Sequence, residues 1–360
     1  MLSRRELITA GAAFSVFGCK QRQQKSLILG GILPLTGDGS GYGVAASNGA
    51  KLAVDLFNRG AGAGGALRWV SEDSRGDPVA AATAARKLLD VDGATALIGD
   101  VTSAGTHALV PVATRAKVPL VSPAASDPAL SGISPFFARV WPSDQYETEV
   151  LAKYAAGRGY RRIAALYSND DYGAGFFRGF TTAARDRIAF SAAFPPNASD
   201  FRPLLRRVAG ARADAVLLVS LPERARLLIT QMNEAGVKLP ILATASIEDP
   251  QIAALSSASN ITFASPVPVD PNGSARRRFE VEYRRAYRTE PGVLADTGYD
   301  AANLLIAAWK TNPDPAAMMQ WIRSQHGYDG ASGRMSFTPQ GDVVKPYRLK
   351  RGGAGGFNWI

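Results

Sequence analysis

The sequence predicts an α/β protein made of two similar halves, each with a parallel sheet. Short apolar runs of the buried-strand type alternate along the chain with helix-length segments that carry one apolar face. This alternation restarts after the turn Pro142-Ser143-Asp144. The chain has 360 residues, more than the roughly 100–200 residues of a typical domain. Because a strand–helix–strand unit lays consecutive strands side by side and parallel, two such series indicate two sheets.

The first half opens on an apolar strand that ends at Pro34, before Thr36-Gly37. A Gly-rich loop at residues 37–43 follows it. Pro78 suits the first turn of a later helix, where the N–H that proline lacks would be unpaired anyway. The predicted elements are a strand at 26–35, a helix at 44–59, a strand at 66–73, a helix at 79–90, a strand at 96–98, a helix ending near 117 and a strand at 118–121.

The second half repeats this pattern and then adds a helical and extended tail. We expect the last residues to form a hairpin around Gln340-Gly341-Asp342, and residues 352–360 give no clear pattern. The predicted elements are helices at 145–158, 174–187, 200–209, 222–235, 274–287, 293–311 and 316–324, strands at 161–167, 188–194, 213–219 and 239–243, an extended segment at 260–269, and the hairpin strands at 334–337 and 347–350.

The N-terminal residues predict an export signal. A short positive segment with Arg4 and Arg5 precedes the apolar run Leu7–Gly18. This run is too short to span a bilayer as a stable helix. We therefore assign residues 1–18 to a signal peptide, and within it Ser3–Ile8 resembles a twin-arginine export motif.

Cys19 is the only cysteine, so the chain can form no internal disulfide. Val16-Phe17-Gly18 before it resembles a bacterial lipobox, in which the cysteine becomes the lipidated first residue of the mature protein. On this interpretation residues 19–26 are a lipidated tether, and the protein is periplasmic or extracytoplasmic and held on a membrane through lipid on Cys19. The alternative is an ordinary cysteine at the end of the signal's apolar region.

The basic surplus does not predict a nucleic-acid partner. The formal net charge is +10, and such a surplus can serve nucleic acid or membrane contact. The basic residues, however, are spread along predicted helix faces, as at residues 158–162, 202–207 and 276–278. They are not interleaved with aromatic residues on which bases could stack. We therefore predict a solvated basic surface.

The stretch from Leu97 to Asp127 predicts an anion site. One predicted strand ends before Thr102-Ser103, and the next ends before the polar turn 122–127. Both turns lie at the carboxyl ends of parallel strands, the edge where open α/β sheets bind ligands. Hydroxyls and free N–H groups at a helix start can hold a carboxylate. The alternative is that these hydroxyls only cap helices.

A series of short motifs, in a fixed order over most of the chain, resembles the branched-chain amino-acid-binding (leucine/isoleucine/valine-binding) substrate-binding proteins of bacterial ABC importers, which are type I periplasmic binding proteins. The resemblance runs from about residue 27 to 349. The motifs are Pro34-Leu35-Thr36-Gly37 with Tyr42-Gly43, Glu72-Asp73 with Gly76-Asp77-Pro78, Ile98-Gly99 before Thr102-Ser103, Ser122-Pro123-Ala124-Ala125-Ser126, Pro142-Ser143-Asp144, Asp171-Tyr172-Gly173, Pro222-Glu223 and Gly298-Tyr299-Asp300-Ala301.

The resemblance implies two Rossmann-like lobes with parallel-sheet cores, joined by a hinge that the chain crosses three times. The crossings would fall near residues 142–144, 266–268 and 333–336. It also implies a monomer without a cofactor that is no enzyme, closes on a small-molecule ligand, and hands it to the permease and ATPase subunits of an ABC importer. Lobe one would be residues 27–141 plus 269–333, and lobe two residues 142–268 plus 334–360.

The resemblance further implies the residues that bind the ligand. In relatives the two polar turns hold the carboxylate of an amino acid, which assigns that group here to Ser103, the backbone of Ala124, and Ser126. The other implied lining residues, from both lobes and the hinge, are Tyr42, Thr102, Trp141, Tyr172, Ser220, Ala245 and Glu248.

The sequence departs from this family where an ammonium group would be held. Relatives that bind amino acids carry an acidic residue just after the fifth strand of lobe two, and that place falls on Ala245. An unpaired buried ammonium costs several kcal/mol. Either Glu248 reaches in, or the ligand has no ammonium, and we favour the second interpretation: a carboxylate-bearing aliphatic or aromatic acid.

Other functions have less support from the residues. Gly41-x-Gly43-x-x-Ala46 is a loose dinucleotide fingerprint without its acidic residue at the expected distance. The chain has only two histidines, His107 and His326, and no Gly-x-Ser-x-Gly motif that would place a nucleophilic serine beside a histidine base. Two histidines and one cysteine also cannot build a zinc site. The remaining alternative is a binding protein of the same fold that senses its ligand and acts on a receptor or regulator.

Overall fold

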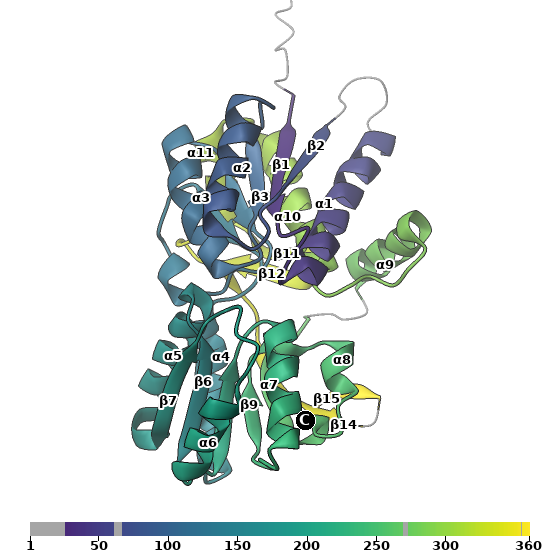
Figure 1. Ribbon diagram of the computed structural model, residues 1–360. Coiled ribbons are helices and arrows are strands. Elements are labelled where there is room, and N and C mark those ends of the chain that lie inside the picture. Colours follow the sequence, from purple (N-terminus) through teal and green to yellow (C-terminus); the bar gives the residue numbers. More distant parts are fainter. Residues whose placement is uncertain (1–25, 61–66, 269–272, 354) are drawn as a thin grey trace, which may run out of the picture.

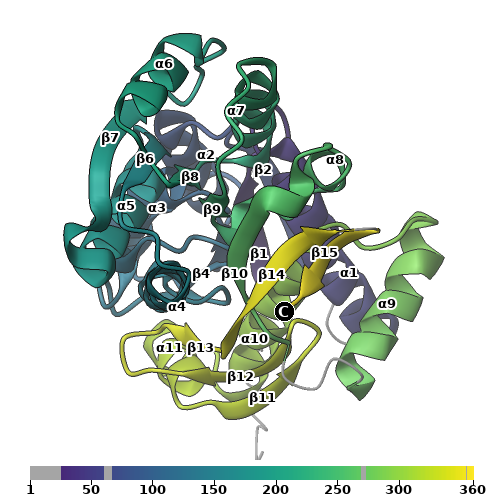
Figure 2. The same ribbon diagram turned by 90° about the horizontal axis from the view of Figure 1, so that it is seen from below.

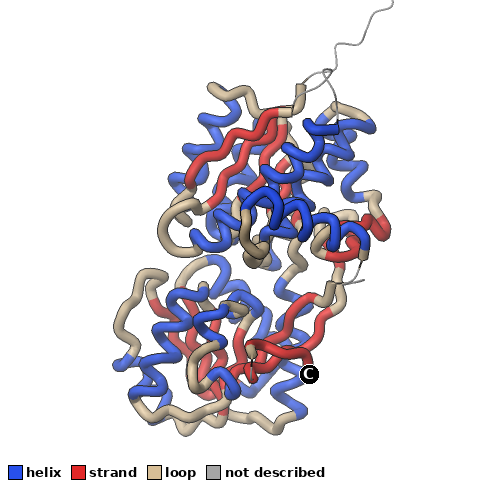
Figure 3. The backbone as a smooth tube through the Cα atoms, turned by 90° about the vertical axis from the view of Figure 1, so that its right-hand side faces the viewer, coloured by secondary structure: helices blue, strands red, loops and turns tan. Residues whose placement is uncertain are grey.

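The computed structural model describes residues 26–60, 67–268, 273–353 and 355–360. The predicted signal peptide and Cys19 lie outside these residues. Figure 1 shows two bodies, one above the other, each with its own sheet. In the side view of Figure 3, helices cover the strands of each body. We call the upper body lobe one and the lower body lobe two.

Lobe one is built on a fully parallel sheet of five strands in the order β2-β1-β3-β4-β5. Helices cover both of its faces, and β3, β4 and β5 are accordingly buried throughout. The strands are β1 (Ile28–Leu33), β2 (Arg68–Asp73), β3 (Ala96–Gly99), β4 (Leu120–Ser122) and β5 (Phe137–Arg139). The helices are α1 (Ser40–Gly60), α2 (Pro78–Asp90), α3 (Ser103–Ala116), α10 (Ala295–Thr311) and α11 (Pro315–Arg323).

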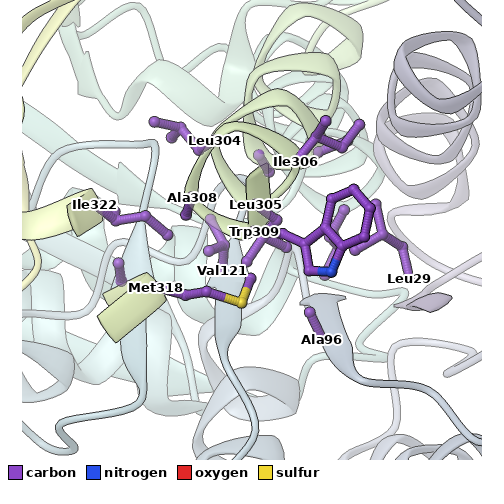
Figure 4. Packing of buried hydrophobic residues seen from close by; sticks show 14 of the residues in the cluster. Leu29, Ala96, Val121, Leu304, Leu305, Ile306, Ala308, Trp309, Met318 and Ile322 are labelled. Carbon is purple, nitrogen blue, oxygen red and sulfur yellow. The ribbon is translucent and has the colours of Figure 1, made fainter. Parts of the chain in front are cut away.

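Two apolar cores fill lobe one, one on each face of its sheet. Helices α2 and α3 pack on the face that includes Ile32 and Leu97. Helices α1, α10 and α11 pack on the face that includes Leu29 and Val121, and Figure 4 shows Trp309 and its neighbours in this core. Alternate residues of β1, β3 and β4 therefore enter opposite cores, which is why these strands are continuous apolar runs in the sequence.

Helices α1 and α10 approach closely through glycines. A Cβ added at Gly49 would lie 1.9 Å from the carbonyl oxygen of Ala295, and one added at Gly298 would lie 2.1 Å from that of Ala46. A third glycine, Gly43, packs its backbone against the Pro34 carbonyl in the same way. Helix α1 begins at Ser40 and therefore includes part of the Gly-rich stretch at residues 37–43 that was predicted as a loop.

Lobe two is built on a seven-stranded sheet in the order β15-β14-β10-β9-β8-β6-β7. The five strands β6 to β10 are parallel, whereas β14 and β15 join antiparallel, as Figure 2 shows beside β10. The strands are β6 (Ile163–Ser168), β7 (Ile188–Phe194), β8 (Ala215–Val219), β9 (Ile241–Ala243), β10 (Ile261–Pro266), β14 (Tyr347–Gly353) and β15 (Gly356–Trp359). The helices are α4 (Asp144–Gly157), α5 (Asp171–Ala184), α6 (Arg202–Gly210), α7 (Pro222–Glu234) and α8 (Pro250–Ala253).

A small third sheet corrects the predicted lobe boundary. It comprises β11 (His326–Gly330), β12 (Gly333–Phe337) and β13 (Val343–Val344), beside α9 (Ser274–Tyr287). Met335, Phe337 and Val343 pack in the core of lobe one. Residues 334–344 therefore belong with lobe one, and the third crossing follows Lys345 instead of lying at 333–336.

The predicted hairpin between residues 334–337 and 347–350 is also wrong, because the two segments belong to different lobes. Strand β12 turns back onto β13, while β14 pairs with β10 in lobe two. Within the stretch that gave no pattern, residues 352–353 complete β14 and residues 356–359 form β15. In the described ranges, no helix is both long and apolar enough to cross a membrane.

Candidate functional site

A cavity of about 480 Å³ lies between the two lobes. Its lining residues follow the carboxyl ends of strands in both sheets, the edge that binds ligands in open α/β folds. All of the residues that the sequence assigns to the site line it except Glu248: Tyr42, Thr102, Ser103, Ala124, Ser126, Trp141, Tyr172, Ser220 and Ala245.

The two polar turns of lobe one meet at this cavity. Thr102 caps α3, because its hydroxyl accepts the N–H of Gly105 at 3.1 Å. Ser103, the first residue of the helix, accepts the N–H of Asp127 through its hydroxyl at 3.2 Å and so ties the two turns together. The Ser103 hydroxyl keeps its own proton to donate. The turns thus present the positive end of α3 and a hydroxyl donor to the cavity.

Arg139 on β5 holds the second turn in place. Its side chain is 0% exposed. Nη1 donates to the carbonyl oxygens of Asp127 at 2.8 Å and Ala125 at 3.3 Å, and Nη2 donates to the Ser131 hydroxyl at 2.7 Å. Nε donates to the Asp342 carboxylate at 2.7 Å. Arg139 therefore joins the ligand-facing turn to the segment between β12 and β13.

Lobe two contributes a hydroxyl cluster. The Tyr172 hydroxyl donates to Thr244 at 2.6 Å and lies 3.1 Å from the hydroxyl of Ser246. From lobe one, the Tyr42 hydroxyl donates to the backbone carbonyl of Ser246 across the cleft. Burial raises the pKa of Tyr42 and of Tyr172, so both phenols stay protonated. Trp141, where the chain first crosses between the lobes, adds an aromatic wall.

Two carboxyl groups that the sequence analysis did not assign also line the cavity. Asp144 and Glu147 occupy the first turn of α4, and each is 1% exposed. Ser126 donates to Asp144 Oδ2 at 2.9 Å, and the N–H of Ala245 donates to Glu147 Oε1 at 2.8 Å. Their spacing was a usable signal, because acids at i and i+3 share one helix face, but acids in a first helical turn are also common for capping reasons alone.

Burial changes the protonation of both acids. It raises the pKa of Asp144 to about 7, against the opposing hydrogen bond from Ser126. Burial, followed by the nearby charge of Asp144, holds the pKa of Glu147 well above its usual range. The pair therefore favours at least one protonated carboxyl at neutral pH, because two buried carboxylates one helical turn apart repel each other.

Glu248 does not reach the cavity. Its carboxylate pairs with the ammonium group of Lys350 on β14. The ammonium group of Lys350 also lies 4.4 Å from the ring centre of Trp359. The interpretation in which Glu248 turns into the site is therefore not what the structure shows. The carboxyl group that contacts Ala245, just after β9, is that of Glu147, which accepts the backbone N–H of Ala245.

Polar contacts between the lobes close the mouth of the cleft. Arg224 of α7 donates through Nη2 to both carboxylate oxygens of Asp38, at 3.0 and 2.9 Å, and through Nε to Oδ2 at 3.2 Å. Beside this pair, the N–H of Gly39 donates to Glu223 at 3.3 Å. Asp38 comes just before α1 in lobe one, so these contacts exist only when the lobes are together.

We expect Asp38→Asn to weaken ligand binding by about two- to fivefold. The ion pair is partly exposed, and such pairs contribute at most about 1 kcal/mol. Losing it shifts the population toward the open form, and the apparent affinity falls by the same factor. Calorimetric titration with a ligand found in the screen described below measures the change. Asp55→Asn, which removes an exposed pair with Lys51 inside α1, should leave the affinity unchanged; equal affinities for the wild type and Asp38→Asn would contradict the closing role.

In the described part of the chain, no group of three or more His, Cys, Asp or Glu residues is arranged to hold a metal ion. The two histidines lie on separate elements. His107 of α3 is 2.8 Å from the Asp127 carboxylate, which raises the pKa of the imidazole. His326 begins β11. Neither lines the cavity.

Comparison with known proteins matches nearly the whole described chain. An amino acid binding protein of Pseudomonas aeruginosa is 24% identical over 355 residues, 94% of this chain and 93% of that protein. The solved leucine binding protein LivK of Thermotoga maritima has a TM-score of 0.85 at 25% identity, covering 93% of this chain and 97% of that one. An ABC transporter solute binding protein of R. palustris in complex with benzoate has a TM-score of 0.83 at 19% identity, with 93% and 95% covered, and shows the fold alone.

The resemblance read from the motifs is thereby confirmed, as is the fold class of two α/β lobes with parallel-sheet cores. The family model for periplasmic binding proteins matches residues 27–356. The chain therefore belongs to the periplasmic binding protein family, and its fold is that of the type I, leucine-binding kind.

Proposed function

We propose that this protein is the extracytoplasmic solute-binding component of an ABC importer. It captures a small carboxylate-bearing ligand, an amino acid or a related organic or aromatic acid, in the cleft between its lobes and delivers it to a membrane permease. The observation that carries this proposal is the cavity itself, which both lobes line and whose mouth their contacts close. The amino acid binding protein and the benzoate complex among its relatives support the ligand class.

The cavity suits one small acid. Its volume of about 480 Å³ lies within the roughly 300–1,000 Å³ of small-molecule sites. Trp141, Val101 and Leu294 form apolar parts of the cavity wall. Polar lining residues such as Ser103 and Tyr172 interrupt this apolar surface. The start of α3 with Ser103, together with the backbone of Ala124, binds the carboxylate, because the N-terminal end of a helix favours a negative charge.

Ligand capture works by closure. Ser103 contacts the ligand from lobe one, and the Tyr172 cluster contacts it from lobe two. Only the closed form makes both sets of contacts, so the ligand shifts the population toward closure. The protein acts as a monomer, without a cofactor and without turning over its ligand, and presents the closed form to the permease and ATPase subunits. The signal peptide with its twin-arginine-like motif directs export of the protein, and lipid on Cys19 then keeps the protein at the membrane.

A thermal-shift screen of amino acids and aliphatic and aromatic acids tests the ligand class, because ligand bound to the native state alone raises its stability. We expect Ser103→Ala to weaken binding of the best ligand roughly ten- to hundredfold, the effect of one hydrogen bond to a charged group. Ser126→Ala should have a smaller effect, since the Ser126 proton is donated to Asp144. Ser324→Ala, far along the chain after α11, is the control. Unchanged affinity of Ser103→Ala would refute the assigned carboxylate site.

A further inference from the structure

We propose that Asp144 and Glu147 form a cation subsite that holds a protonated amine of the ligand, which makes the ligand a small zwitterion rather than a plain acid. The inference rests on the proposed function and names the second polar group that the cleft recognises. It also assigns a role to two buried acids that the carboxylate site does not use.

Both carboxyl groups are placed to face the cavity. They share one face of α4, are almost completely buried, and line the cleft. Each is oriented through one oxygen: Asp144 Oδ2 accepts from Ser126, and Glu147 Oε1 accepts from the N–H of Ala245. In the described residues the second oxygen of each accepts no hydrogen bond from the protein. A ligand amine can therefore donate to Asp144 Oδ1 and Glu147 Oε2.

In the described residues no cation pairs directly with these acids, although the nearby charge of Arg139 lowers the pKa of Asp144. Neither forms an ion pair with Lys, Arg or His in the described ranges. Arg139 lies near Asp144, but its donors go to Asp342, Ser131 and the carbonyls of Ala125 and Asp127. A buried carboxylate without a counter-charge is costly. The pair must either keep protons, as the raised pKa values of both acids indicate, or receive a cation from the ligand.

An unpaired hydroxyl in the same cavity supports a ligand with donors. Ser220, just after β8, is 1% exposed and lines the cavity, yet its Oγ has no hydrogen-bond partner in the described residues. The buried hydroxyl of Tyr347, on which both acids act electrostatically, is unpartnered as well. An ammonium group carries three donors and no acceptor. Two carboxylate oxygens and one hydroxyl oxygen are the acceptors that such a group needs.

The position of the acids also disfavours a ligand that is only an anion. The Ser126 proton is committed to Asp144, so this hydroxyl cannot donate to a second carboxylate. A carboxylate bound beside ionised Asp144 and Glu147 would be repelled. The ligand carboxylate at the start of α3 and the ligand amine at the start of α4 thus define two separate ends of the site. The positive end of α4 favours the ionised acids once a cation is bound.

Binding of an amine should release protons. Besides each other, the charged and titratable groups that act on the pair are Arg139, Asp127, Tyr172 and Tyr347. In the free protein the raised pKa keeps a proton on the pair near pH 7, and an ammonium beside it lowers that pKa. Between the two pKa values binding expels a proton, so affinity for an amine-bearing ligand falls as the pH decreases.

The experiment compares matched pairs of compounds on the full chain by calorimetry: leucine with 4-methylpentanoate, phenylalanine with 3-phenylpropanoate, and glutamate with glutarate. We expect at least one amino acid to bind, and to bind more than tenfold tighter than its amine-free partner. Glu147→Gln, which keeps the hydrogen bond from Ala245, should reduce this preference to less than threefold. Glu149→Gln, an exposed residue of the same helix, should retain it.

Titration in phosphate and in Tris, whose ionisation enthalpies differ, adds a second measurement. Proton release by the wild type should disappear when Asp144→Asn is combined with Glu147→Gln, an effect that a purely structural role of the acids would not produce. If Glu147→Gln fails to fold, Asp144→Asn alone serves in its place. Amine-free acids that bind as tightly as the amino acids, or a preference unchanged by Glu147→Gln, would overturn the cation subsite and leave the proposed function intact. Binding of no carboxylate-bearing compound would overturn the proposed function.

Discussion

Replacing Arg139 with alanine should lower the free energy of unfolding by about 3–5 kcal/mol, the usual loss when one member of a buried ion pair is removed. The guanidinium is 0% exposed and its partner Asp342 is nearly buried. Without the guanidinium, the Asp342 carboxylate and the backbone carbonyls of Ala125 and Asp127 lose their hydrogen-bond donor in a buried site. Urea unfolding followed by circular dichroism measures the loss.

The matched control is Arg202→Ala at the start of α6. Arg202 also pairs with acids, Asp200 and Glu234, but its side chain is largely exposed, and such pairs contribute less than about 1 kcal/mol. A loss for Arg139→Ala as small as that of the control would contradict the central role of Arg139. The variant should also bind ligand more weakly at equal folded fraction, because the turn that carries Ala124 and Ser126 loses its support.

Gly298→Ala should destabilise the protein by about 3 kcal/mol, at the upper end of the usual cost of overpacking. The added Cβ would lie 2.1 Å from the Ala46 carbonyl oxygen. That atom belongs to the backbone of α1 and cannot turn aside, so α1 and α10 must separate and loosen the core that they share. Thermal unfolding by calorimetry measures the effect.

A glycine in open space on the same helix pair provides the control. Gly41, in the first turn of α1, has no atom within 4 Å of an added Cβ. Gly41→Ala should be neutral or stabilising by up to about 1 kcal/mol, since alanine has the higher helix propensity. Gly49→Ala should behave like Gly298→Ala, because its Cβ would meet the Ala295 carbonyl at 1.9 Å. Equal stability of Gly41→Ala and Gly298→Ala would show that the helices can adjust freely.

The parallel sheets could be predicted because their signals are local. Most of the parallel strands, such as β1, β3, β4, β6 and β8, are short apolar runs next to a helix with its own start signal, whereas the three-residue strand β5 was not predicted. The lining residues Thr102, Ser103, Ser126 and Tyr172 could be placed for a related reason: they follow strand ends, and parallel strands bring those ends to one edge. The tail gave no such signal, because β14 finds its partner β10 far back in the chain.

The acids of α4 show a different limit of sequence reasoning. The family pattern directs attention to the residue after β9, where alanine stands at position 245. In the structure the backbone N–H of Ala245 donates to a carboxyl group from Glu147, almost a hundred residues earlier. Only the folded structure shows that these two residues are neighbours. In the sequence alone, Asp144 and Glu147 could not be told from ordinary residues of a first helical turn.

The late crossing of the chain into lobe two has a consequence for biosynthesis. Strand β14 lies between β10 and β15, so the second sheet lacks two strands until the residues of β14 and β15 have been made. Lobe one, which includes β12 and β13, completes its core before Tyr347 is reached. A chain that ends prematurely after Lys345 should therefore retain one finished lobe and expose the unpaired edge of β10, a template for aggregation.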